Sequence, residues 1–180
     1  MFRAKNSVKF LLSGLAGLVL IAGGARSASA QTNTDTATAN SGATIVTPIS
    51  ITKVNDLKFG SVATTSSAGT VTIAPAGNRT GSANVVLVAA VGDAPGAASF
   101  TITGQTGYSY NVLLPADGTV TLNGPNSATM AVDSFTKSSV NSYVLNGGAD
   151  TLSVGATLSV GANQEPGAYT ATFDVIVSYD

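Results

Sequence analysis

The side chains that carry most enzyme chemistry are missing from this sequence, which contains neither histidine nor cysteine. Histidine is the usual general base near neutral pH and the commonest metal ligand. Cysteine would supply a thiol nucleophile or a thiolate metal ligand. Because few enzyme mechanisms survive both absences, the sequence predicts a protein that is not an enzyme and that needs no metal or cofactor.

The nine carboxylates are the remaining acid–base groups, and they are scattered along the chain. No two lie within two residues of each other, so the spacing of a calcium loop is absent. A pair could meet in space, as glycoside hydrolysis requires, but several stand in turn-like sequence, where aspartate bonds its own backbone. Turn formation is the simpler interpretation. They are Asp35, Asp56, Asp93, Asp117, Asp133, Asp150, Glu165, Asp174 and Asp180.

The last stretch, residues 167–180, offers a different chemistry, that of backbone pairing. Its side chains alternate between apolar and polar, which predicts a half-buried β-strand with one apolar face. A chain end frays unless it is tied into a sheet, so we expect this strand to pair with a neighbour. The apolar face carries Tyr169, Ala171, Phe173, Val175, Val177 and Tyr179.

The first 30 residues have the organisation of an export signal. Arg3, Lys5 and Lys9 precede an apolar run over 10–25, and Ala28-Ser-Ala30 supplies a small-x-small cleavage site. The alternative, an uncleaved anchor, would need about twenty apolar residues. We therefore expect a signal peptide over 1–30 and export through the inner membrane, which would place the protein in the periplasm, at the cell surface or in the medium. We expect no membrane insertion of the mature chain.

Removing the signal leaves 150 residues, enough for one domain with a sizeable core. Four basic residues then face nine acids, a formal net charge of −5, which argues against nucleic-acid or anionic-lipid binding through a basic patch. Residues 31–42 hold no large apolar side chain and are typical of a flexible polar leader. A single domain is expected over 43–180.

Short strand-like stretches separated by Gly, Pro and Asn turns fill this domain, without a sustained helical period. About nine or ten such strands predict an all-β fold, an immunoglobulin-like antiparallel β-sandwich. Asn84–Val91 is apolar without alternation, which is typical of a central strand covered on both faces. Leu152–Val160 alternates without a fault and should lie antiparallel to the terminal strand, unless a long connection carries that strand to the opposite sheet.

Five stretches together resemble the bacterial family catalogued as domain of unknown function 4402, and the resemblance covers essentially the whole mature chain. They are Pro48–Thr52, Asp56–Val62, Ala98–Gly104, Met130–Asp133 and Leu158–Gly167. The family has no established activity, so the resemblance implies an exported β-domain and little about mechanism.

Asp56-Leu-Lys-Phe-Gly60 and the terminal strand also look like subunits of chaperone–usher fimbriae, especially spore-coat-U-like ones. Such pilins commonly carry a glycine fourteen residues from the end and an aromatic residue next to last, positions that Gly167 and Tyr179 occupy here. The resemblance implies a periplasmic chaperone that grips the terminal strand, an outer-membrane usher, and like subunits. Each neighbour would donate an N-terminal extension to the subunit's groove by β-strand addition.

A donor strand needs large alternating apolar residues, and residues 31–40 offer only alanines. The expected donor is Ala43–Ile51, through Ile45, Ile49 and Ile51, although this segment could equally be the first strand of a complete sandwich. The leading hypothesis is an exported structural or adhesive protein, a pilin-like subunit or surface adhesin that assembles through strand pairing. The alternative is a secreted monomeric binding module, for example for polysaccharide.

Overall fold

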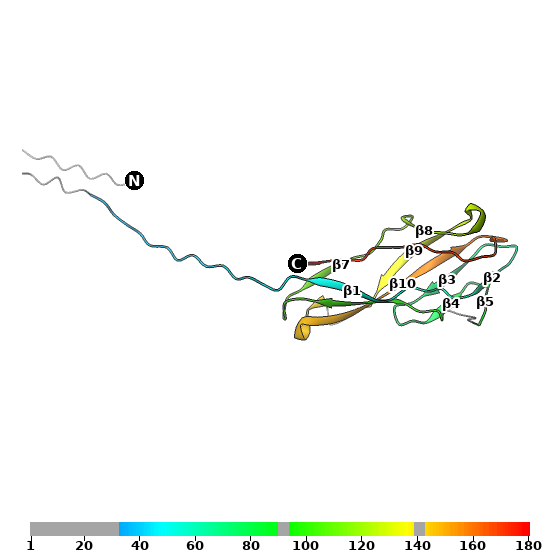
Figure 1. Cartoon of the computed structure of the whole chain (residues 1–180), viewed down its shortest axis with the longest axis horizontal. Helices are drawn as coiled ribbons and strands as arrows, with labels where there is room; N and C mark the ends of the chain where they lie inside the picture. Colours follow the sequence, from blue (N-terminus) through cyan, green and yellow to red (C-terminus); the bar gives the residue numbers. More distant parts are fainter. Residues whose placement is uncertain (1–32, 90–93, 139–142) are drawn as a thin grey trace, which may run out of the picture. The chain divides into compact units, whose positions relative to one another are not determined.

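The computed structural model describes residues 33–89, 94–138 and 143–180. The chain divides into two units, Met1–Gly42 and Ala43–Asp180. Residues 33–42 are exposed and carry no secondary structure, and every strand that the structure describes lies in the second unit (Figure 1). The predicted signal peptide lies outside the described residues.

The described part of the second unit contains eleven strands and two short 3-10 turns, and all strand pairs are antiparallel. The predicted class, an antiparallel β-sandwich, is confirmed. The strands are β1 (Ser50–Asn55), β2 (Val62–Thr64), β3 (Gly69–Ile73), β4 (Arg79–Gly81), β5 (Val85–Leu87), β6 (Ala98–Thr103), β7 (Tyr110–Leu113), β8 (Val120–Asn123), β9 (Thr129–Lys137), β10 (Ala149–Val160) and β11 (Ile176–Tyr179), and the turns are η1 (Pro125–Ser127) and η3 (Asn146–Gly148).

The longest strand, β10, is the centre of the main sheet because three strands pair with it. Its first half pairs with β6, its second half with β3, and its middle with β9. β1 extends the sheet beyond β6, β4 extends it beyond β3, and β8 extends it beyond β9. Two separate ribbons, β11–β7 and β2–β5, complete the sandwich.

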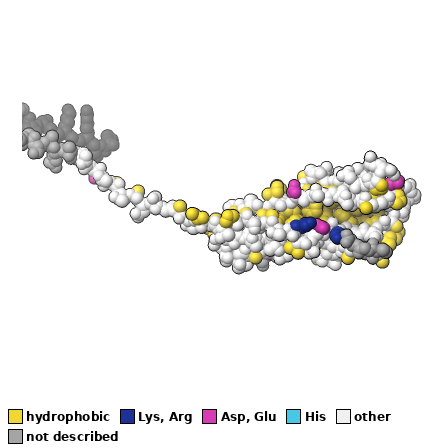
Figure 2. Space-filling view, viewed as in Figure 1, with side chains coloured by type: hydrophobic (Ala, Val, Ile, Leu, Met, Phe, Trp, Pro, Cys, Tyr) yellow, Lys and Arg dark blue, Asp and Glu magenta, His cyan; other side chains and the backbone are white. Residues whose placement is uncertain are grey.

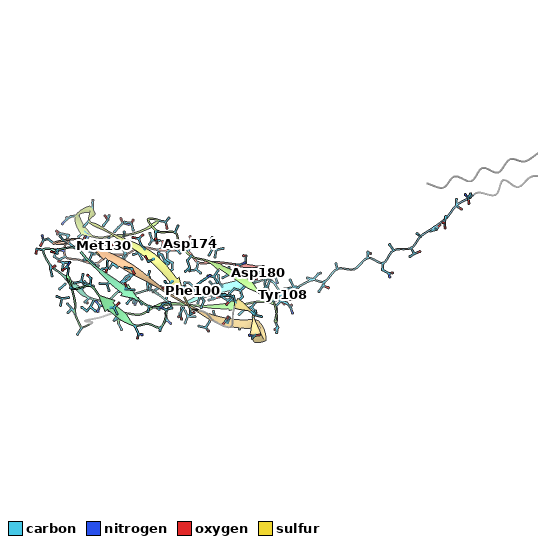
Figure 3. The ribbon with its side chains drawn as sticks, turned by 180° about the vertical axis from the view of Figure 1, so that it is seen from behind. Phe100, Tyr108, Met130, Asp174 and Asp180 are labelled. Carbon is cyan, nitrogen blue, oxygen red and sulfur yellow. The ribbon has the colours of Figure 1, made fainter. Side chains whose placement is uncertain are left out.

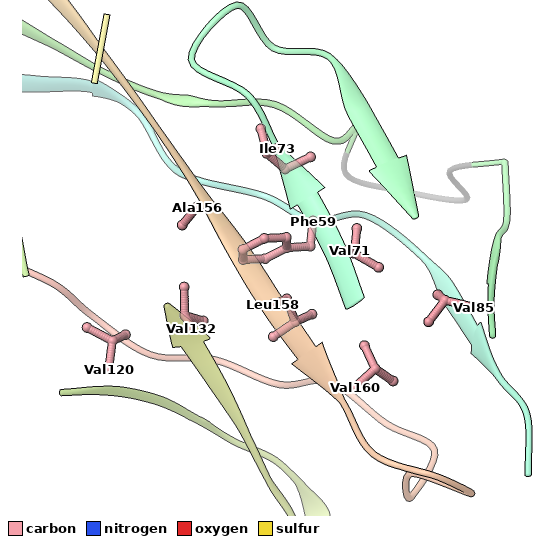
Figure 4. Close-up of a cluster of buried hydrophobic side chains, with 9 residues drawn as sticks. All are labelled: Phe59, Val71, Ile73, Val85, Val120, Val132, Ala156, Leu158 and Val160. Carbon is pink, nitrogen blue, oxygen red and sulfur yellow. The ribbon is translucent and has the colours of Figure 1, made fainter. Parts of the chain in front are cut away.

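Two apolar clusters form the core, and β10 contributes to both. The first half of β10 packs with β6 and β7. The second half packs with β3, β8 and β9, and Figure 4 shows this second cluster. Gly155 lies between the halves, where an added Cβ would stand 2.1 Å from the Ile73 carbonyl oxygen. Only glycine therefore lets the end of β3 approach β10 this closely. The buried apolar side chains of β10 are Leu152, Val154, Ala156, Leu158 and Val160, in the predicted alternation.

The prediction that residues 84–91 form a central strand covered on both faces is wrong. The strand found there, β5, has three residues and pairs only with β2 among the described strands. Val85 is buried, but Val86, Leu87 and Val88 are 55%, 38% and 40% exposed. The apolar run predicted a strand buried on both faces. The strand belongs instead to a two-stranded ribbon that has the core on one face and solvent on the other. Residues 90–91 lie outside the described part of the chain.

The expectation that the terminal strand pairs with β10 is also wrong, and the long-connection alternative is correct. β11 pairs with β7 in a two-stranded ribbon that is separate from the sheet of β10. The connection packs against η1, since a Cβ on Gly167 would stand 2.6 Å from Pro125 Cγ. Thr170 then forms an isolated bridge with Asn123 at the end of β8. These contacts carry the chain away from β10 before the last strand begins.

Candidate functional site: two open strand edges

The terminal segment, which we define as residues 169–179, keeps the predicted period-two pattern, but at shallow depth. Tyr169, Phe173, Val175, Val177 and Tyr179 are all half-buried, and the alternate positions between them are exposed. Ala171, predicted on the same apolar face, is exposed instead. Only its last four residues, β11, form a ladder with a neighbouring strand. Figure 3 shows Asp180 near Tyr108 at one end of the domain and Met130 near the other. Thr170 bridges Asn123 of β8 and β11 pairs with β7, so the segment runs beside these two strands along the rim of the sandwich.

The outer edge of β11 is unpaired in the part of the chain that the structure describes. The Asp180 amide donates to the Ser109 carbonyl oxygen on the β7 side. Because backbone groups alternate between the two edges of an antiparallel strand, Val177 and Tyr179 direct their amides away from β7. The structure records no backbone partner for these two amides among the described residues.

β1 has a similar open edge, since β6 is the one described strand that pairs with it. Gly104, just after β6, donates its amide to Gly148 on the β10 side. By the same alternation, the register leaves Ile51 and Lys53 with backbone groups that point away from β6. A register shift between Lys53 and Asn55 then bends the strand.

Partly exposed apolar side chains occupy the surface near these two edges. Leu57, Phe135 and Phe173 pack against both core clusters, and the Phe135 and Phe173 rings are 5.1 Å apart. Figure 2 shows an apolar band along the face that carries β1 and the terminal segment. We use the name apolar trough for six half-buried apolar side chains that pack against the core clusters, Ile51, Leu57, Phe135, Phe173, Val175 and Val177.

A comparison with family models matches residues 49–179 to Domain of unknown function (DUF4402). The chain belongs to the DUF4402 family. No curated protein and no solved structure matches this chain. The match covers β1 to β11, so both open edges lie within the DUF4402 domain.

The three isoleucines predicted to donate a strand have different positions in the DUF4402 chain. Ile51 lies in β1 opposite Ile102 of its own β6, and Ile49 packs against the core. Ile45 is 96% exposed. The first strand therefore pairs within its own chain. Of the three isoleucines, Ile45 alone does not pack against its own domain.

Gly167 and Tyr169, also predicted for strand pairing, hold the connection before the terminal segment. Gly167 has a φ of 154° in close contact with Pro125, so a larger side chain there would be strained. The Tyr169 hydroxyl donates to the Glu165 carbonyl oxygen at 2.7 Å and accepts from Gln164 Nε2 at 2.8 Å. These two residues therefore position the terminal segment and do not contribute to its open edge.

Several carboxylates of the DUF4402 domain have turn or core roles. Asp117 accepts the Ser134 amide and Asp133 accepts the Gly118 amide, each at 2.7 Å, which closes the β8–β9 region. Asp150 is buried and accepts the Tyr110 hydroxyl at 2.7 Å. Burial, reinforced by this hydrogen bond, raises the pKa of Tyr110. Sequence reasoning missed this pair because Asp150 precedes the alternating run of β10.

Two further properties of the described residues bear on the chemistry of the domain. No group of three or more acidic, histidine or cysteine side chains is placed to hold a metal ion there. Within those same residues, no helix has both the length and the apolar character needed to cross a bilayer.

Proposed function

We propose that this protein is an exported structural or adhesive subunit, pilin-like in its assembly, that joins like subunits at the bacterial surface through β-strand pairing. The observation that supports it best is that the apolar trough coincides with two strand edges that have no partner among the described residues. A periplasmic chaperone and an outer-membrane usher are the proposed partners during export.

Open edges are templates for pairing, and most proteins shield them with charge, proline or a covering loop. β1 carries one lysine, and β11 carries neither a charge nor a proline. An added strand would bond the free backbone groups at Val177 and Tyr179 and cover half-buried side chains of the trough. Backbone bonds would supply affinity, and alternate side chains would supply specificity.

The test of this proposal is Val177→Pro in the mature chain. Proline removes the amide that faces the open edge of β11, keeps an apolar side chain, and is tolerated on an edge strand whose N–H faces solvent. The wild-type chain should form multimers in light scattering and fibres or strings in negative-stain microscopy. Val177→Pro should remain folded by circular dichroism and lose both.

Val177→Ala is the matched control, because it shortens the side chain and keeps the amide. It should assemble more like the wild type than Val177→Pro does. A Val177→Pro chain that assembles as fast as the wild type would contradict pairing at this edge. A wild-type chain that stays monomeric at all concentrations, with or without a chaperone, would contradict the proposal as a whole.

A secreted binding module is the second candidate, and a shallow cleft of about 500 Å³ favours it. The cleft lies along β8 and the start of the terminal segment, which the Asn123–Thr170 bridge joins at one point. Its hydroxyl and amide groups are of the kind that hydrogen-bond sugar hydroxyls. Its polar lining is Thr119, Thr121, Asn123, Thr170 and Thr172. A screen of the mature chain against bacterial and host glycans tests this candidate, and a screen without binding counts against it.

A further inference from the structure

The hydroxyl of Tyr179 joins the end of the chain to the segment that precedes β1. It donates to the Thr47 carbonyl oxygen at 2.7 Å and accepts the Gln105 amide at 2.6 Å. Tyr179 is the penultimate residue, and 132 positions separate it from Thr47. One phenol therefore bridges the terminal strand, the segment before β1 and the turn after β6.

Gln105 completes this junction through its side chain. Its Oε1 atom accepts the Thr47 amide at 3.2 Å and the Thr47 hydroxyl at 3.3 Å. Both backbone groups of Thr47 are thus bonded to groups of the domain. The next residue, Pro48, has no amide to donate, so the Thr47 amide is the nearest one before Ile49 that can be bonded in this way.

The surroundings of the phenol leave little freedom to the hydroxyl. A Cβ added to Gly104 would stand 2.3 Å from it, so only glycine leaves the space that it occupies. The Tyr108 ring packs edge-on against the Tyr179 ring, with centroids 5.7 Å apart. The hydroxyl is therefore held where it meets Thr47.

We propose that Tyr179 is a latch that makes Thr47 the first residue held by its own domain and presents Ile45 to the apolar trough of a second copy of this chain. The latch is a property of the single chain. The presentation of Ile45 rests on the proposed function. Tyr179 acts here as a positioning residue, since its own ring stays in its own domain.

The exposure of the residues before Thr47 supports the different roles proposed for Thr47 and Ile45. Ile45 is 96% exposed, whereas Val46 is half-buried beside the latch. These two are the only large apolar residues over 33–46. In an extended segment Ala43 and Ile45 share a face, so Ile45 is the one large side chain that this face can offer. The trough is the apolar surface beside an open edge, which fits an extended strand of a like chain.

The latch is tested by hydrogen exchange on the mature wild-type chain and Tyr179→Phe, both as monomers at low concentration. Losing two hydrogen bonds of ordinary strength should speed exchange of the Thr47 and Gln105 amides by about tenfold. Exchange in β10 should stay unchanged. Gln105→Ala removes the other half of the junction and should speed exchange of Thr47 by a similar factor.

Tyr108→Phe is the matched control, because the Tyr108 hydroxyl makes no hydrogen bond recorded in the described structure and its ring stays in place. It should leave exchange at Thr47 within about twofold of the wild type, as expected for an exposed hydroxyl. Unchanged exchange in Tyr179→Phe would overturn the latch, and so would an equal rise throughout the domain.

The presentation of Ile45 is tested by assembly of Ile45→Asp, compared with Thr44→Asp on the neighbouring exposed position. Both variants carry the same new charge, and both should fold normally. Ile45→Asp should assemble at least about tenfold more slowly, because a charge in an apolar trough is strongly disfavoured, and Thr44→Asp should assemble at nearly the wild-type rate. Equal rates for both variants overturn the role of Ile45 while the proposed function stands. A wild-type chain that never assembles overturns both, and the exchange result decides the latch independently.

Discussion

β10 and the terminal segment both alternate between apolar and polar residues, yet they lie at very different depths. The β10 side chains Leu152 and Val154 are 0% exposed, and Val160 is 4% exposed. In the terminal segment, Val175 and Val177 remain half-buried. Three strands pair with β10, whereas β11 has one partner among the described strands.

The difference shows what a period-two pattern encodes. Alternation assigns each side chain to a face of the sheet, and it carries no information about how many strands flank that sheet or cover that face. Depth comes from the neighbours, which are distant in sequence. A strand with the same pattern can therefore be a core element or an open rim, and only the rim can accept another chain.

Gly155→Ala should cause the largest loss of stability, because Gly155 lies where β10 packs closely against both β3 and β9. Its new Cβ would stand 2.1 Å from the Ile73 carbonyl oxygen, which no side-chain rotation can relieve. We expect a loss of about 3 kcal/mol or more in the free energy of unfolding, measured by urea denaturation. Gly161→Ala is the control, since its Cβ would meet only the flexible Gln164 side chain, and a similar loss there would refute the steric account.

The same substitution in the two strands measures their depth directly. Val154→Ala removes a fully buried side chain and should cost about 2.5 kcal/mol, from lost burial and the cavity that remains. Val177→Ala, at the rim, should cost about 1 kcal/mol because part of its side chain already faces water. Urea denaturation of both variants gives the comparison, and equal losses would mean that the rim is as deeply packed as the centre.

The buried Tyr110–Asp150 hydrogen bond should make the free energy of unfolding depend on pH in the alkaline range. Tyr110 of β7 binds Asp150 of β10, and its raised pKa means that folding favours the neutral phenol. The associated stability is full below about pH 10, where the unfolded phenol begins to ionise, and is lost as pH rises further. Near neutral pH, Tyr110→Phe should cost about 1.5 kcal/mol.

The measurement is urea unfolding of wild type and Tyr110→Phe across this range. Ionisation of the other tyrosines cancels between the two proteins. The stability difference between them should shrink above about pH 10, the ordinary tyrosine pKa. A constant difference would mean that the Tyr110 hydroxyl is not held neutral by the fold.

The sequence was sufficient where the local pattern and the final environment agree. The alternation over Leu152–Val160 predicted β10, and that over 169–179 predicted the inward face of the terminal segment except at Ala171, which is exposed. The fold class followed from the density of short strands and turns. In these places the side chains alone determine which groups avoid water.

Prediction failed where the answer depended on partners far away in the chain. The apolar run from Val85 to Val88 predicted a central strand, but a two-stranded ribbon covers one face only. The terminal strand pairs with β7 because the connection packs on η1, and no local signal reports that contact. The Tyr179–Thr47 bond spans 132 positions, so the candidate site could be recognised only as an apolar strand face.

The smallest expected effect belongs to the outward face of β11. Ile176 is 56% exposed and stands opposite Leu113, which is 64% exposed. Ile176→Thr keeps a β-branched residue and removes apolar area that water already reaches, so stability should change by less than about 0.5 kcal/mol. Assembly should also be unaffected, because this side chain points away from the trough. Loss of assembly in Ile176→Thr, with Val177→Ala still competent, would move the pairing surface from the edge of the ribbon to its outer face.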